Sequence, residues 1–175
     1  ASTTDLAITQ SAHTGGLKTI TDSDGLLKWN GHNLLTYSED FDNAAWTKLN
    51  FGIGSIPVVT ANAALDPLGG MTADRVQLDA GSNGSGDYSL LRQVSAFGSS
   101  FTRSIWIKSA TGANQTITLV ATSAAKQVTA TAEWTLVSND GGSGQQQFDI
   151  SVGGTGATPA TADIYVWGAH VYRSD

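Results

Sequence analysis

The amino-acid sequence predicts an all-β fold, a sandwich or barrel of short strands. Polar and apolar residues alternate in short segments, and Gly-, Ser- and Asn-rich turns separate these segments along the chain. No stretch of useful length shows the period of an amphipathic helix. Charged residues are only 14% of the 175 residues, fewer than long helices usually carry.

The first 32 residues show no steady period. Asp22–Gly25 is a strong turn signal, because Asp and Gly tolerate the positive φ that tight turns need. Leu26–Trp29 is predicted to form a short strand after this turn. We interpret residues 1–32 as an N-terminal arm with one hairpin, and residues 33–175 as the main domain.

From Asn33 onward the strand signals become regular, and Phe41–Trp46 is predicted as a single helical turn or a loop. In Phe101–Lys108 the alternation places Trp106 on the face opposite Ile105 and Ile107, as in a strand with one buried face. Strands are predicted over Asn33–Tyr37, Thr47–Ile53, Ile56–Asn62, Thr72–Leu78, Asp87–Phe97, Phe101–Lys108, Gln115–Ala121, Gln127–Thr131, Glu133–Ser138, Gln145–Val152 and Asp163–Tyr172.

Composition excludes several classes of function. The chain contains no cysteine, which rules out disulfides and thiolate metal sites. The formal net charge is -6 and the nine Lys and Arg residues are scattered, whereas nucleic-acid binding needs a clustered basic surface. No run approaches the roughly 18 apolar residues of a membrane helix, so membrane insertion is not expected.

Three segments carry a resemblance to a known family. Asn33-Leu34-Leu35-Thr36-Tyr37-Ser38-Glu39-Asp40-Phe41, the following Ala44–Lys48 and the closing Ile164–Val171 resemble the first and last strands of a domain common in bacteriophage tail and other virion proteins. That domain is similar to the carbohydrate-binding-module jelly rolls with a galactose-binding-like fold. The resemblance implies a jelly-roll β-sandwich with an irregular N-terminal arm.

Catalysis is not predicted. Hydrolysis by a nucleophile needs a nucleophile, a base and an orienting group together, but His13, His32 and His170 lie in unrelated contexts and no Gly-x-Ser-x-Gly motif is present. Glycoside cleavage needs a separated carboxylate pair, and the only Glu residues are Glu39 and Glu133. We therefore expect a protein that is not an enzyme.

The resemblance also implies a structural Ca²⁺, which related jelly rolls hold between the first and last strands. Ca²⁺ takes six to eight oxygen ligands, and the candidate ligands here are Glu39, Asp40, Asp42 and Asp163. The alternative is that Asp40 caps a turn and the other three carboxylates are solvated. No loop with the fixed spacing of a calcium motif is present.

Aromatic residues predict an interaction surface. Sugars stack on Trp and Tyr, and polar neighbours bind their hydroxyl groups. Three aromatic side chains are predicted on strand faces turned away from the core: Trp106, Tyr165 and Trp167. Three further side chains could supply hydrogen bonds nearby: Arg92, Gln93 and Lys108. This face either binds a glycan or is covered by protein.

The predicted function is that of a non-catalytic structural or adhesion module of a virion, in a tail, a fibre or a capsid decoration. Its expected partners are other virion subunits, copies of itself (a trimer fits the family) and a cell-surface glycan. The alternative is a carbohydrate-binding module appended to a larger glycan-active enzyme.

Overall fold

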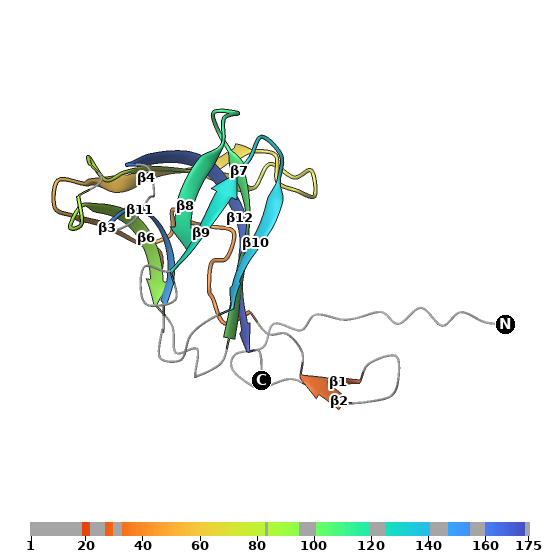
Figure 1. Cartoon of the computed structure of the whole chain (residues 1–175). Coiled ribbons are helices and arrows are strands. Elements are labelled where there is room, and N and C mark those ends of the chain that lie inside the picture. Colours follow the sequence, from red (N-terminus) through yellow and green to blue (C-terminus); the bar gives the residue numbers. More distant parts are fainter. Residues whose placement is uncertain are drawn as a thin grey trace. The chain divides into compact units, whose positions relative to one another are not determined.

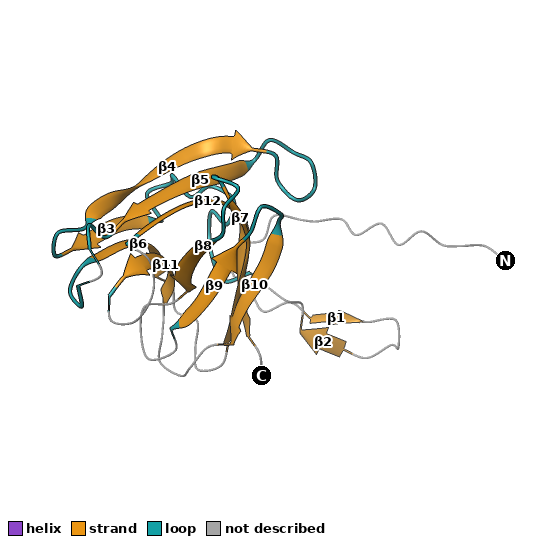
Figure 2. Ribbon diagram, turned by 45° about the horizontal axis from the view of Figure 1, so that its top comes forward, coloured by secondary structure: helices purple, strands orange, loops and turns teal. Residues whose placement is uncertain are grey.

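Two five-stranded antiparallel sheets form the fold (Figure 1). The computed structural model describes residues 19–21, 27–29, 33–82, 84–94, 101–119, 125–140, 147–154 and 160–173. The chain divides into two compact units, Ala1–His32 and Asn33–Asp175. Every regular element in the described ranges is a strand (Figure 2), which confirms the all-β prediction.

Sheet I has the strand order β10-β7-β12-β5-β4, and sheet II has the order β3-β6-β11-β8-β9. The strands of sheet I are β4 (Ser55–Ala64), β5 (Ala73–Asp79), β7 (Phe101–Ser109), β10 (Thr135–Asp140) and β12 (Thr161–Arg173). Those of sheet II are β3 (Thr47–Phe51), β6 (Tyr88–Val94), β8 (Gln115–Leu119), β9 (Lys126–Ala130) and β11 (Gln147–Gly153). The long β12 lies between β7 and β5 and forms the centre of sheet I.

The core lies between the inner faces of the two sheets. Alternate residues of each strand point inward, since the side-chain period of a strand is two. Fully buried inner residues include Ile105, Ile107, Ile164 and Val166 from sheet I. Trp46 joins this core, with its ring 4.8 Å from Phe41 and 5.8 Å from Phe148 between centroids.

A one-residue bulge interrupts β12. Trp167 pairs with Trp106 and His170 pairs with Ser104, so Gly168 and Ala169 lie together opposite one residue of β7. Gly168 has φ 60°, the left-handed region that only Gly adopts without strain. The extra residue lets both halves of β12 keep their apolar side chains inward.

The segment from Asn33 to Tyr37 is not a strand, so that prediction was wrong. It lies against β12, and the Leu34 N–H donates to the Val171 carbonyl at 2.8 Å. The Asn33 side chain makes two more contacts, with the Ala169 carbonyl at 2.9 Å and the Val171 N–H at 3.0 Å. The segment then turns at Tyr37, whose φ of 50° ends extended pairing.

In the N-terminal unit, β1 (Thr19–Thr21) pairs antiparallel with β2 (Leu27–Trp29). The strand predicted over Leu26–Trp29 matches β2 to within one residue, while the predicted turn Asp22–Gly25 lies outside the described residues. Elsewhere the predicted strands match the observed ones within a few residues at their ends. Phe41–Trp46 is a series of turns rather than a helix.

Candidate functional site

The outer face of sheet I carries a compact group of large side chains. Trp106 and Trp167 are direct cross-strand partners on β7 and β12, and Lys108 is the partner of Tyr165 two residues further along. Directly opposite residues share one face of a sheet. All four side chains are half-buried. We call these four residues the aromatic platform.

The loop between β4 and β5 supports the platform. Trp167 Nε1 donates to Thr72 Oγ1 at 3.0 Å, and the Thr72 hydroxyl donates to Asp66 at 2.6 Å. Asp66 also accepts the N–H groups of Leu68 and Gly70. These bonds lower the pKa of Asp66, with the Thr72 bond contributing most. The carboxylate thus orders the loop that holds one indole in place.

Trp106 is positioned by the bulge beside it. A methyl group at Gly168 would lie 3.7 Å from Trp106 Cδ1, so the indole packs over the backbone there. Two more rings continue along β12 beyond the bulge, with the His170 and Tyr172 centroids 5.4 Å apart. Sequence reasoning missed these two as neighbours of the platform; the interruption of the alternation at Gly168 was the signal for them.

An ion pair lies next to the platform. Arg75 is the β5 partner of Tyr165, and its guanidinium donates two bonds to Asp163, at 2.8 Å from Nε and 2.6 Å from Nη2. The Asp163 hydrogen bond raises the pKa of Arg75. The bidentate geometry fixes both side chains and neutralises both charges.

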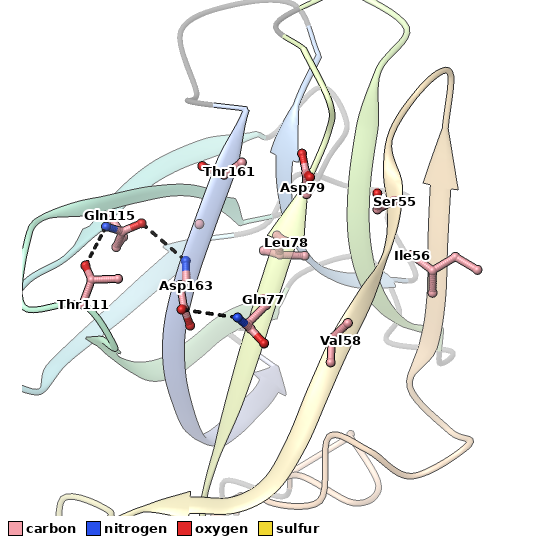
Figure 3. A pocket seen from close by; sticks show the side chains of 11 residues that line it. Ser55, Ile56, Val58, Gln77, Leu78, Asp79, Thr111, Gln115, Thr161 and Asp163 are labelled. Carbon is pink, nitrogen blue, oxygen red and sulfur yellow. Dashed lines mark hydrogen bonds between the residues drawn. The ribbon is translucent and has the colours of Figure 1, made fainter.

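A pocket of about 520 Å³ opens at the far end of the same sheet (Figure 3). Its polar lining comes from strands β4, β5 and β12, from Thr111 in the segment after β7 and from Gln115 at the start of β8. We call it the end pocket; its lining residues are Ser55, Ile56, Val58, Gln77, Leu78, Asp79, Thr111, Gln115, Thr161, Ala162 and Asp163.

Two of the predicted site residues do not lie with the platform, because β6 belongs to sheet II. Gln93 is 3% exposed, accepts the Thr36 N–H at 2.9 Å and donates to the Thr36 carbonyl at 2.8 Å. It therefore holds the segment before β3 and has no surface left for a ligand. The prediction that Gln93 and Arg92 adjoin Trp106 was wrong.

Arg92 points to the outer face of sheet II. Its Nε and Nη2 donate to the buried Asp149 carboxylate at 2.7 and 2.8 Å. It also lines a second hollow, of about 370 Å³, with Phe51, Gly86, Tyr88 and Leu90. The Tyr88 ring lies against the backbone of Gly154, where a methyl group would overlap it.

The four residues considered for Ca²⁺ do not form one site. Both oxygens of Asp163 accept bonds from Arg75, and Asp40 interacts instead with Asp42 and Asn43. Among the described residues, no group of three His, Cys, Asp or Glu side chains could hold a metal ion. The donor set proposed from the resemblance therefore does not fit a shared cation. Of the three His residues, His13 and His32 lie outside the described part of the chain.

Comparison with known proteins finds solved structures of similar fold. No protein-family model and no curated protein sequence matches the chain. A family 11 carbohydrate-binding module from Clostridium thermocellum, solved with a β-1,3-1,4-mixed-linked tetrasaccharide, has a TM-score of 0.51 at 11% identity, over 81% of this chain and 95% of that chain. The chain is therefore similar in fold to carbohydrate-binding-module β-sandwiches. A second such module, from work on promiscuous specificity in the β-sandwich superfamily, has a TM-score of 0.51 at 13% identity, over 89% of this chain and 72% of that chain.

The sandwich is also similar in fold to part of a phage protein. The enzymatically active domain of tailspike protein 4 of bacteriophage CBA120 has a TM-score of 0.51 at 13% identity, over 81% of this chain. This chain spans about a fifth of that domain, 21% of its length. At these identities the likeness concerns the fold. In the part of the chain that the structure describes, no helix has the length and apolarity to span a membrane.

Proposed function

We propose that this chain is a non-catalytic adhesion module of a virion, in a tail, a fibre or a capsid decoration, and that it binds a cell-surface glycan on the aromatic platform. The observation that carries the proposal is the direct pairing of Trp106 with Trp167 on the solvent side of sheet I. The likeness in fold to carbohydrate-binding modules and to a tailspike domain supports it.

The chemistry of the platform suits a sugar. Paired residues on an antiparallel sheet have Cβ atoms about 4.5–5.5 Å apart, so the two indoles can meet successive apolar faces of one glycan. Lys108, beside Tyr165, adds three N–H donors for hydroxyl groups. Half-buried aromatic rings with a few polar neighbours are the usual lining of such sites.

A second candidate function is assembly with other virion subunits or with copies of this chain, including a trimer. It is favoured by three exposed apolar residues in the β4–β5 loop, which Thr72 ties to Trp167: Leu65 is 57% exposed, Leu68 82% and Met71 58%. Exposed apolar groups of this kind are typical of protein interfaces. The fold likeness to carbohydrate-binding modules is also consistent with the alternative function, a carbohydrate-binding module appended to a larger glycan-active enzyme.

A glycan array with wild type, Trp106→Ala and Phe51→Ala tests the proposal. Phe51 is 50% exposed on sheet II and is the matched aromatic control. We expect Trp106→Ala to weaken binding roughly tenfold or more, since truncating a central aromatic anchor usually costs about 2 kcal/mol or more.

Loss of binding in Phe51→Ala alone would overturn the platform and move the site to the hollow on sheet II. Absence of binding by wild type, with concentration-dependent oligomers in light scattering, would favour assembly over adhesion.

A further inference from the structure

The outer face of sheet I is one continuous ladder from the platform to the end pocket. Trp167 and Trp106 form its first row, and the Lys108–Tyr165–Arg75 row follows. The third row consists of Asp163, Gln77 and Val58. Asp79 with Thr161 and Ser55 forms the fourth. Because partners in a row share one face, the pocket and the platform belong to the same surface.

The end pocket presents free hydrogen-bonding groups. Among the described residues, Gln77 Oε1, Asp79 Oδ2 and the hydroxyl groups of Ser55 and Thr161 have no hydrogen-bond partner. All four residues are exposed. Figure 3 shows them on three adjacent strands, with Gln77 and Asp79 on the central one. Such a set both donates and accepts, as the hydroxyl groups of a sugar require.

The other side chains of the pocket hold its shape. Gln115 donates to Thr111 Oγ1 at 3.0 Å and accepts the Asp163 N–H at 3.4 Å (Figure 3). Val58, 56% exposed, adds an apolar surface beside Gln77. A polar rim next to one apolar side chain fits a ring with hydroxyl edges and a C–H face.

The charge of the pocket limits what it can bind. Arg75 neutralises Asp163, whereas Asp79 forms no ion pair among the described residues. The pocket is therefore negative, on a chain of net charge -6. An anionic sugar would meet like-charge repulsion there, so an uncharged unit is favoured.

We propose that the end pocket binds one uncharged sugar unit of the same glycan that stacks on the aromatic platform. Thr161 and Trp167 are six residues apart on β12, which is about 20 Å at the usual rise of a strand. The glycan would lie along β12 across the Arg75–Asp163 pair. This inference rests on the proposed function and adds a second contact and a selectivity for neutral sugars.

Affinity gel electrophoresis tests it with soluble β-glucan, galactomannan and starch as neutral probes and polygalacturonate as the acidic probe. The variants are Gln77→Ala, Asp79→Asn and Trp106→Ala, with Thr129→Ala, exposed on sheet II, as the control. We expect Gln77→Ala to weaken binding of the retained neutral polymer roughly tenfold, as for loss of a hydrogen bond to a ligand. Asp79→Asn should increase the weak retardation by polygalacturonate, and Thr129→Ala should match wild type.

The outcomes separate the pocket from the platform. Neutral binding that is lost in Trp106→Ala and unchanged in Gln77→Ala and Asp79→Asn overturns the pocket and leaves the proposed function standing. Binding lost in Gln77→Ala and unchanged in Trp106→Ala overturns the platform, and with it the proposal that one glycan spans the platform and the end pocket. No retardation of wild type by any neutral polymer overturns both.

Discussion

Two buried carboxylates near the sheet ends illustrate how single residues order this fold. Asp74, 1% exposed, accepts the N–H groups of Phe41 and Asn62, both at 2.8 Å. Burial is the main reason why its pKa is raised, and Asp42 and Asp40 add to the rise. Asp66 shows the opposite shift, because three hydrogen-bond donors, those of Thr72, Leu68 and Gly70, contact its carboxylate and favour the charged form.

Asp66 gives a pH prediction with a definite sign. Its folded pKa lies below the ordinary value of 3.8, so its stabilising contribution is present above pH 3.8 and is lost as the pH falls through the folded pKa. In Asp66→Asn the amide oxygen can keep the Leu68 and Gly70 bonds, but no charge is lost on acidification. We expect melting temperatures between pH 7 and pH 2 to fall less steeply for Asp66→Asn than for wild type.

Glu133→Gln is the control, since Glu133 is exposed and its substitution changes the net charge by the same amount. Equal slopes for Asp66→Asn and wild type would contradict the role given to Asp66.

At the scale of a single strand, the bulge in β12 predicts the energetic cost of replacing one residue, Gly168. A non-glycine residue in the left-handed region costs about 1–2 kcal/mol, and Gly168 has φ 60° with room for a methyl group. Gly168→Ala should therefore lower the free energy of unfolding by about 1–2 kcal/mol through backbone strain alone. Urea denaturation measures this.

Gly168→Asn should lower the free energy of unfolding by less than Gly168→Ala does, because Asn tolerates the left-handed conformation better. Equal losses in the two variants would show that crowding against Trp106, rather than φ, sets the cost.

Strand positions and faces could be predicted where burial alternates, as it does over Arg103–Ser109 in β7 and Thr161–Trp167 in β12. Trp106, Tyr165 and Trp167 are each on the predicted outer side, and Ile105, Ile107, Ile164 and Val166 are fully buried. Alternation says nothing about which sheet a strand joins. Arg92 and Gln93 were for that reason placed beside the wrong strand, and the end pocket, built from β4, β5 and β12, had no sequence signal of its own.

The strand prediction for Asn33–Tyr37 was wrong for a different reason. Its apolar residues read as a strand, but Asn33 replaces two backbone bonds to β12 with bonds from its side chain. Competition of Asn side chains with ladder bonds is a general source of such errors.

At the scale of the whole molecule, we expect the stability of the sandwich to depend on the residues from Asn33 onward and not on residues 1–32. A fragment of residues 33–175 keeps the Asn33 bonds and the Leu34–Val171 bond. We expect its melting temperature to equal that of the full chain, measured by circular dichroism.

A fragment of residues 36–175 is the matched comparison. It loses those bonds and the buried Leu35. We expect its free energy of unfolding to be lower by about 2 kcal/mol or more, as for a truncated core leucine. A large loss already in the 33–175 fragment would show that the sandwich needs the N-terminal unit.

The bulge at Gly168 has a consequence for comparing sequences. Inward positions are even-numbered up to Val166 and odd-numbered from Ala169 to Val171, all of them buried. An alignment that carries one alternating phase through the whole of β12 would assign His170 and Tyr172 to the core and Ala169 to the surface. A relative without the extra residue should be aligned with a one-residue gap at Gly168, and only then do its surface rings fall in the same columns as those of this chain.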